Sequence, residues 1–227
     1  MSFDLEQIVP WGRSYEEYVS MFSLSKDDLN LYCLGCADGP SSFNCGLTKR
    51  GGQIISVDPL YQYNKEQIAQ RIKDTRKKVL EQTQKNEHEF VWTTIHSLEE
   101  LGRIRISAMQ EFLGDYEGGI NEGRYVPESL PSLSFVDKQF RLALCSHFLF
   151  LYSDHLNLDF HINSVHEMCR VAHEVRIFPL LKLGSMPSPY VEPVIKNVEG
   201  MGYRAEIVEV EYEFQRGGNM MLKIRRA

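Results

Sequence analysis

The segment Leu34–Phe43 combines two glycines and a carboxylate in one short turn. It reads Leu-Gly-Cys-Ala-Asp-Gly-Pro-Ser-Ser-Phe and follows an apolar run. Gly35 and Gly39 would let a ligand approach the backbone, and Gly39 can also adopt a positive φ. Asp38 lies in the same turn, where its carboxylate can pair with a cationic group such as an amino-acid ammonium. The turn therefore predicts a site for a positively charged ligand.

The order of residues in this turn differs from the order that dinucleotide sites use. Those sites carry G-x-G-x-x-G, in which the turn faces a pyrophosphate and the third glycine allows tight helix packing. Here the order from Gly35 to Gly39 is G-x-x-D-G. Because a carboxylate would repel a pyrophosphate, the pattern favours a ligand that carries an ammonium and a sulfonium.

A second acidic residue, Asp58, is predicted at the tip of the next strand along the chain. An acidic residue at this place can accept hydrogen bonds from both hydroxyls of a ribose. Its alternative role is to cap the turn that follows the strand. Together with the glycine turn, Asp58 favours ribose binding.

The elements that must position these residues form a strand–helix–strand unit. Residues 30–35 are a short apolar run ending at glycine, which predicts a buried strand. Residues 40–49 predict a helix with Pro40 in its first turn, and residues 53–57 predict a second buried strand. Such a unit is typical of a parallel sheet with helical crossovers.

Helical spacing marks two further regions. The aromatic and apolar residues of 14–22 predict an N-terminal helix that packs on the body. Residues from about 62 to 123 carry two helical patterns, which we interpret as a helical insertion and not as a separate domain. The basic face of the first pattern, which includes Arg71, is predicted to be solvated. The whole chain, residues 1–227, is predicted to form a single domain.

The remaining elements alternate between strand and helix until the end of the chain. The predicted strands are 124–126, 139–146, 174–181, 204–214 and 219–225, and the predicted helices are 161–172 and 188–202. Gly217-Gly218 suits a tight hairpin turn, so the last two strands are predicted to be antiparallel.

These features resemble the class I S-adenosylmethionine (SAM)-dependent methyltransferase family. The segment Leu34–Gly39 matches the glycine motif of that family, and Ile54–Asp58 matches its second motif. The segment from Leu133-Ser-Phe135 through Asp137 to the strand Phe140–Cys145 looks like the approach to the family's fourth strand and that strand itself. Ser134 and Arg141 stand where the family often has proline and aspartate. The resemblance covers residues 30–60 and 124–227.

The resemblance implies a Rossmann-like α/β fold with a mostly parallel seven-stranded sheet, an antiparallel C-terminal hairpin and a helical insertion. It implies SAM as the cofactor, bound at the carboxyl edges of the strands. The methionine portion would lie on Gly35, Ala37, Asp38 and Gly39, and the ribose on Asp58. Ser129 and Leu130 would flank the adenine, and Ser146 and His147 would face the sulfonium and the methyl acceptor.

His147 is the candidate general base, since histidine can accept a proton near neutral pH. The alternative is a histidine that only shapes the pocket, because the sulfonium leaving group is already activated and many methyl transfers need no base.

Arginine and aromatic residues in predicted loops are candidates for substrate contacts. Trp11-Gly-Arg-Ser-Tyr15 and Gly123-Arg-Tyr125 each hold an arginine that could clamp a carboxylate of the cofactor or of an acidic substrate. Packing is the alternative, and for Trp11 the favoured one. We select Arg124 and Tyr125, together with Tyr152, whose hydroxyl can reach the acceptor site.

The composition of the chain limits the classes of partner that it is predicted to bind. The formal net charge of -6 makes a nucleic-acid partner unlikely, so the acceptor is predicted to be a small molecule. Cys33 and Cys36 form a lone C-x-x-C with no second pair, so we interpret them as structural thiols and predict no metal site. An odd number of cysteines and an N-terminus without a signal-peptide pattern predict a cytoplasmic protein. No apolar stretch reaches the roughly 20 residues that span a bilayer.

Two other functions stay open. The first is an NAD-dependent oxidoreductase on a related sheet, against which the G-x-x-D-G turn and the terminal hairpin argue. The second is a nonenzymatic protein that binds SAM but has no acceptor pocket beside His147. The sequence predicts neither the accepting atom nor the oligomeric state.

Overall fold

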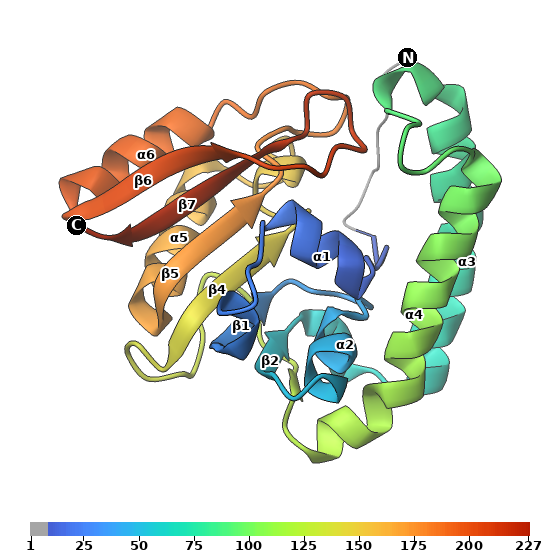
Figure 1. Cartoon of the computed structure of the whole chain (residues 1–227), viewed down its shortest axis with the longest axis horizontal. Coiled ribbons are helices and arrows are strands. Elements are labelled where there is room, and N and C mark those ends of the chain that lie inside the picture. Colours follow the sequence, from blue (N-terminus) through green and yellow to red (C-terminus); the bar gives the residue numbers. More distant parts are fainter. Residues whose placement is uncertain (1–8) are drawn as a thin grey trace.

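A seven-stranded sheet forms the centre of the computed structural model, which describes residues 9–227 (Figure 1). Its strand order is β3-β2-β1-β4-β5-β7-β6. The strands are β1 (Tyr32–Cys36), β2 (Gln53–Val57), β3 (Tyr125–Val126), β4 (Phe140–Ser146), β5 (Ala172–Phe178), β6 (Tyr203–Glu209) and β7 (Met220–Arg226).

Strands β1 to β5 pair in parallel, whereas β7 is antiparallel to both β5 and β6. The predicted Rossmann-like sheet with an antiparallel C-terminal hairpin is therefore confirmed. The single domain predicted over residues 1–227 stays a prediction, and its first eight residues lie outside the described part of the chain.

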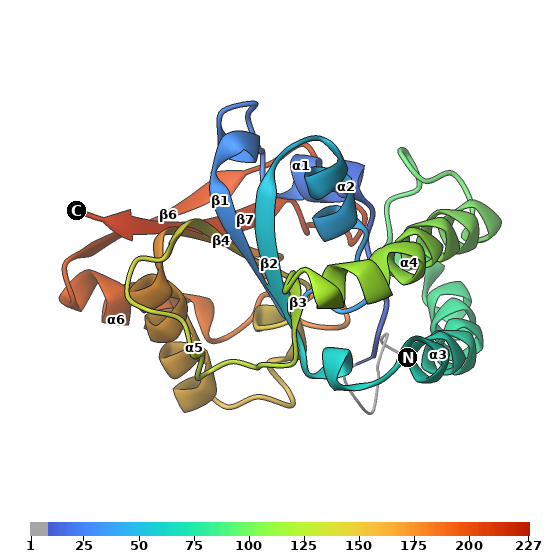
Figure 2. The same ribbon diagram turned by 90° about the horizontal axis from the view of Figure 1, so that it is seen from below.

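Helices cover both faces of the sheet. Figure 2 shows α5 and α6 on one face and α1 and α2 on the other, with α3 and α4 side by side beyond the β3 edge. The α-helices are α1 (Tyr15–Met21), α2 (Phe43–Lys49), α3 (Lys65–Lys85), α4 (Leu98–Asn121), α5 (Leu158–Val171) and α6 (Val191–Gly200). The short 3-10 helices are η1 (Asp28–Asn30), η2 (Pro59–Gln62), η3 (Glu87–Glu89) and η4 (Phe150–Tyr152).

Strand β4 illustrates why the core has two layers. Side chains alternate between the faces of a strand. Accordingly Ala143 and Cys145 pack with α5 and α6, whereas Leu142 and Leu144 pack with α1 and α2. Because both faces are covered, the strand appears in the sequence as an unbroken apolar run.

The two predicted helical patterns within residues 62–123 are present as α3 and α4. Helix α3 begins at a capping box in which the Asn64 side chain accepts a hydrogen bond from the backbone of Gln67. The apolar face that the spacing predicted, with Ile68 and Ile72 on α3 and Phe112 on α4, packs against η2 and β3. The pair is thereby attached to the sheet at its β3 edge.

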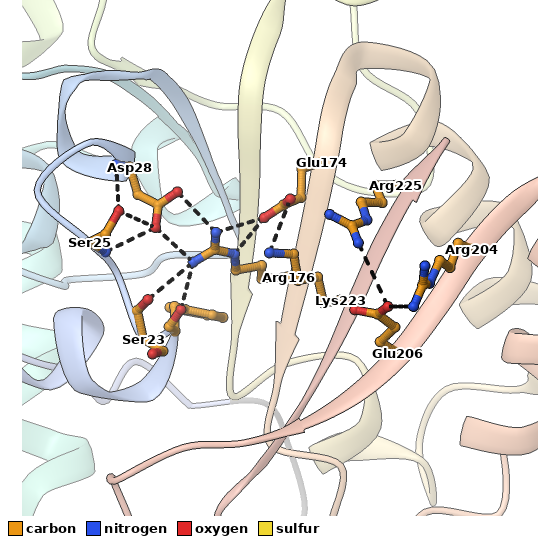
Figure 3. Close-up of polar contacts among 10 residues, drawn as sticks. Ser23, Ser25, Asp28, Glu174, Arg176, Arg204, Glu206, Lys223 and Arg225 are labelled. Carbon is orange, nitrogen blue, oxygen red and sulfur yellow. Dashed lines mark hydrogen bonds and ion pairs between the residues drawn. The ribbon is translucent and has the colours of Figure 1, made fainter. Parts of the chain in front are cut away.

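An arginine on β5 fixes the N-terminal segment on the sheet (Figure 3). Arg176 is 4% exposed and donates a hydrogen bond of 2.8 Å to the carbonyl of Phe22, just past the end of α1. Its guanidinium also pairs with Asp28 at 3.0 Å and with Glu174 at 2.7 Å. Helix α1 is therefore held in place by a buried, fully engaged cation.

The connection between β6 and β7 differs from the prediction. A tight turn at Gly217-Gly218 was expected, but β6 ends at Glu209 and β7 begins at Met220, so residues 210–219 form a loop. The physical reason is that the loop pairs with another segment. Phe214 accepts a hydrogen bond of 2.8 Å from the Val91 amide, and its ring stacks on Phe90 at 5.0 Å. The two glycines only form a turn inside this loop.

Within residues 9–227, no helix has both the length and the apolar character needed to cross a membrane.

Candidate functional site

A cavity of about 470 Å³ opens where the parallel strands end. Its walls include Ala37–Pro40 after β1, Asp58–Leu60 after β2, Glu128–Leu130 after β3 and Ser146–Phe148 at the end of β4. The strand order reverses between β1 and β4, and ligands of open α/β sheets bind in the crevice at such a switch point. The volume is in the range of small-molecule sites.

Residues outside the strand ends complete the walls. The segment Val9–Trp11 and Arg13 line the cavity from the N-terminal side, and Tyr18 does so from α1. Arg71 and Val79 line it from α3. The basic face of α3 was predicted to be solvated, and Arg71 is exposed as predicted; it also lies on the cavity wall, where its charge opposes the rise in the pKa of Asp58.

The turn after β1 is held against the end of β2. Ala37 and Gly39 both have left-handed backbone, with φ of 56° and 52°. The amide of Ala37 donates to the Val57 carbonyl at 2.8 Å, and the amide of Gly39 donates to Asp58 Oδ2 at 2.9 Å. For alanine this conformation costs roughly 1–2 kcal/mol. The turn therefore keeps a strained backbone at the cavity wall.

Gly35 has a different role from the one predicted. It is not a wall residue of the cavity. A Cβ at this position would lie 1.8 Å from Asp38 Oδ2, so the absence of a side chain makes room for the carboxylate of Asp38.

Asp38 lies on the cavity wall but is only 6% exposed. Its Oδ1 accepts a hydrogen bond from the Tyr18 hydroxyl at 2.9 Å, and its Oδ2 accepts one from the Ser56 hydroxyl at 2.6 Å. Burial raises the pKa of Asp38 to about 6, and the neighbouring carboxylate of Asp58 adds to this rise. Two hydroxyl donors thus partly offset the loss of water.

Asp58 caps the turn after β2 and also lies on the cavity wall. Its Oδ1 accepts a hydrogen bond from the Leu60 amide at 2.7 Å and so caps η2. Its Oδ2 accepts the Gly39 amide, and the side chain lines the same cavity as Asp38. Burial raises its pKa. Because an ionised carboxylate has about four lone-pair sites, Asp58 can still accept hydrogen bonds from a ligand.

The other predicted cofactor contacts, Ser129, Leu130 and Ser146, also lie on the cavity wall. The Ser146 hydroxyl is 2.9 Å from His147 Nδ1. The structure therefore brings the residues after β3 and the residues at the end of β4 to one cavity.

His147 has left-handed backbone, with φ of 51°, and its amide donates to the Phe178 carbonyl at 2.7 Å. Burial lowers the pKa of His147 well below its usual value, and Arg13 and Arg105 add to this effect. The imidazole is therefore neutral at neutral pH, and the lowered pKa makes it a weaker base than an ordinary histidine. Tyr152, 4% exposed, lines the cavity nearby.

Arg124 and Tyr125, predicted as substrate contacts, are not wall residues of the cavity. The guanidinium of Arg124 forms a two-point pair with Asp115 on α4, at 2.7 and 3.0 Å. The Tyr125 hydroxyl donates to the same carboxylate at 2.9 Å. These side chains fasten α4 to β3. Their role is therefore in packing, which was the alternative to a substrate contact.

The wall residues that were not selected as contacts include Arg13, whose loop was only a candidate, Tyr18 and Arg71. Tyr18 was counted only as part of the apolar face of α1, although its hydroxyl required a partner in the core. Its position four residues before the buried ring of Phe22 gave no sign that the partner would be Asp38.

The cysteines and acidic residues give no sign of a metal centre in residues 9–227, where no group of three or more candidate ligands comes together. All five cysteines are free and buried. Burial raises the pKa of Cys36 well above its usual value, so this thiol is unreactive at neutral pH. The cytoplasmic location remains a prediction.

Comparison with known sequences gives a full-length relative. The chain is 35% identical over 226 residues to the uncharacterized protein MJ0045 of Methanocaldococcus jannaschii, and the match covers 98% of each chain. No protein-family model matches the chain.

Comparison with solved structures identifies the fold. A magnesium protoporphyrin IX methyltransferase from Synechocystis PCC 6803, solved with bound SAM, superposes with a TM-score of 0.50 at 10% identity over 94% of this chain and 78% of that chain. A mitomycin 7-O-methyltransferase superposes with a TM-score of 0.51 at 10% identity over 94% of this chain and 54% of that one. At such identities the likeness concerns the fold, which is that of class I SAM-dependent methyltransferases, as the sequence predicted.

Proposed function

The chain belongs to the family of the uncharacterized protein MJ0045, and from its fold and its cavity we propose that it is a SAM-dependent methyltransferase acting on a small molecule. One observation carries the proposal. Two carboxylates, Asp38 and Asp58, lie with a tight glycine turn on the wall of one cavity at the switch point of the sheet. A cationic nucleoside amino acid is complementary to this arrangement.

The donor would lie along the strand ends. We propose that Asp58 accepts the ribose hydroxyls and that Ser129 and Leu130 flank the adenine. The backbone of Ala37 and Gly39 would contact the methionine portion. The charge of Asp38 would attract the ammonium, although both its oxygens already accept hydrogen bonds. Gly35 would contribute only by making room for Asp38.

Bound SAM supplies a methyl group on a sulfonium, and the chain supplies alignment. Ser146 and His147, at the end of β4, would face the acceptor atom. The neutral imidazole of His147 would accept a hydrogen bond from the acceptor, but its lowered pKa disfavours full proton transfer, so alignment carries most of the rate. Apolar walls, including Phe148 and Leu151, would exclude water so that donor and acceptor stay in line.

The cavity and the charge of the chain support a small acceptor. Its opening is bordered by α3 and by the N-terminal segment, which leaves room for a molecule of limited size. A formal net charge of -6 does not favour a polyanion.

The proposal is tested by thermal unfolding with S-adenosylhomocysteine (SAH). A ligand that binds only the folded state stabilises it by about 2.7 kcal/mol at one hundred times its Kd. We expect SAH to raise the Tm of the wild type, and Asp58→Ala to weaken SAH binding at least ~10-fold through the lost hydroxyl contacts. Asp27→Ala, which removes an exposed carboxylate that is not a wall residue, is the control and keeps the full shift.

Other outcomes separate the alternatives. No shift of the wild-type Tm at saturating SAH would sink the proposal. A shift with NAD in place of SAH would point to an oxidoreductase. A shift with SAH but no transfer of labelled methyl to any component of a metabolite extract would indicate a nonenzymatic SAM-binding protein.

A further inference from the structure

Two arginines lie close to the end of β4, but they have different partners. Arg105 on α4 is 1% exposed and is paired with Glu17 of α1. The remaining lone pairs of Glu17 accept hydrogen bonds from the Tyr212 hydroxyl at 2.8 Å and from the Ser14 amide at 2.9 Å. Glu17 is therefore engaged by Arg105, Tyr212 and Ser14.

Arg13 has no carboxylate partner within residues 9–227. Its Nη1 donates to the Trp11 carbonyl at 2.5 Å, and its Nε is a buried donor without an acceptor in the described part of the chain. A guanidinium has five N–H donors, and within residues 9–227 one hydrogen bond of Arg13 is present. Arg13 is a wall residue of the cavity, so an anion in the cavity can reach it.

The backbone holds Arg13 in place. Its carbonyl accepts hydrogen bonds from the Ser42 amide at 3.0 Å and from the Ser41 hydroxyl at 3.1 Å, just before α2. Burial lowers the pKa of Arg13 to about 10, and the charge of Arg105 contributes, so the side chain is still a cation at neutral pH. A fixed, half-buried cation without a carboxylate partner in residues 9–227 favours a ligand that supplies the opposite charge.

The surroundings of Arg13 indicate which ligand supplies that charge. Arg13 interacts electrostatically with the buried cluster of Arg105, Tyr212 and Glu17, whose carboxylate is already engaged by Arg105. It also interacts with Tyr152 on η4 and with His147 just after β4, where the acceptor is proposed to lie. The two carboxylates proposed to hold the donor interact instead with each other. The nearby wall is apolar: Phe148, Leu151, Leu156, Phe160 and Leu183.

From this geometry we infer that Arg13 binds a carboxylate of the methyl acceptor, so that the acceptor is an apolar or aromatic carboxylic acid. The inference rests on the proposed function and names its substrate class. A planar guanidinium matches a carboxylate in a two-point geometry, and the apolar wall matches the hydrocarbon part of such an acid.

The test uses the SAH-loaded protein, with benzoate as the probe and benzamide as its neutral counterpart. In isothermal titration we expect the wild type to bind benzoate at least ~10-fold more tightly than benzamide, as a charge-assisted hydrogen bond requires. Arg13→Gln should remove this preference and change the Kd of SAH by less than about twofold. Arg71→Gln is the matched control, since it removes another cation of the cavity wall and should keep the preference.

Each other outcome counts against the inference. Equal binding of benzoate and benzamide by the wild type overturns it, and so does loss of the preference in Arg71→Gln alone. If Arg13→Gln weakens SAH more than tenfold and keeps the preference, then Arg13 holds the carboxylate of the donor instead. If Arg13→Gln does not fold, Arg13→Lys replaces it, since lysine keeps the charge but cannot bind a carboxylate at two points. Its preference for benzoate over benzamide should be intermediate. Failure of the wild type to bind SAH in the first titration overturns the proposed function, separately from the role of Arg13.

Discussion

At the scale of single residues, the site keeps charges where the fold has removed most of their water. Asp38 is compensated by the Tyr18 and Ser56 hydroxyls, whereas within residues 9–227 Arg13 has one carbonyl acceptor. Such groups store free energy that a ligand of complementary charge can release on binding. The pKa of Asp38 therefore reports how strongly the fold removes water from the charged groups of the site.

The stability of the protein should depend on pH through Asp38. Its pKa is about 6 in the folded state, above the ordinary value of 3.8 that applies to the unfolded chain. Between these values the folded state holds a proton that the unfolded state has released, so the free energy of unfolding falls as the pH rises. The total fall should be on the order of 3 kcal/mol. Asp38→Asn lacks this contribution.

Urea unfolding of the wild type and of Asp38→Asn at pH values from about 4 to 7 measures the effect, with Asp27→Asn as a control. The wild type should lose stability relative to Asp38→Asn across this range, whereas Asp27→Asn should run parallel to the wild type. Parallel curves for all three proteins would contradict the buried position of Asp38. A bound ammonium acts in the opposite sense, since the affinity for SAH should fall as the pH drops below about 6.

The sequence predicted which acidic residues lie at the cavity, but it did not predict which of the two loop arginines does so. Asp38 and Asp58 follow two buried strands, and parallel strands bring their carboxyl ends to one edge, so local patterns sufficed. Arg13 and Arg124 occupy similar aromatic loops in the sequence. Arg124 pairs with Asp115 because α4 packs beside β3. Arg13 lines the cavity and has no carboxylate partner within residues 9–227.

At the scale of elements, one buried cluster joins three parts of the chain. Glu17 lies on α1, Arg105 on α4 and Tyr212 in the loop between β6 and β7. The apolar spacing of α4 correctly predicted Leu101, Ala108 and Phe112 as buried, but it gave no sign that Arg105 would also be buried. No local pattern could do so, because its partner lies 88 residues away in the sequence.

Glu17→Gln should be strongly destabilising. It leaves the Arg105 cation buried without a counter-charge, which costs about 3–5 kcal/mol. Tyr212→Phe removes one neutral donor from the same cluster and should cost only about 0.5–1.5 kcal/mol. Chemical unfolding at pH 7 measures both variants. If both variants lost a similar free energy of unfolding, Glu17 would not be the group that stabilises the buried charge of Arg105.

At the scale of the whole molecule, the α3–α4 pair, whose helix α3 lines the cavity, is joined to the rest of the fold at places that include three side-chain contacts. Arg124 and Asp115 join them beside β3, and Arg105 and Glu17 join them beside α1. The third contact lies between residues 86–97 and the loop 210–219, in which only a tight turn at Gly217-Gly218 was predicted. There Phe90, Trp92 and Phe214 form an aromatic cluster with ring centroids 5.0 to 6.2 Å apart.

This third contact should open independently of the core. Phe214→Ala removes two aromatic contacts, each worth about 0.5–1.5 kcal/mol, so amide exchange in residues 86–97 and 210–219 should become roughly tenfold faster. Amides of β1 and β4 should exchange as in the wild type, because their hydrogen bonds break only on global unfolding. Ile207→Ala, which truncates a side chain 50% exposed on β6, is the control and should leave both segments unchanged. A uniform acceleration across the sheet would mean instead that the aromatic cluster belongs to the cooperative core, and the helical pair could not then move without unfolding the site.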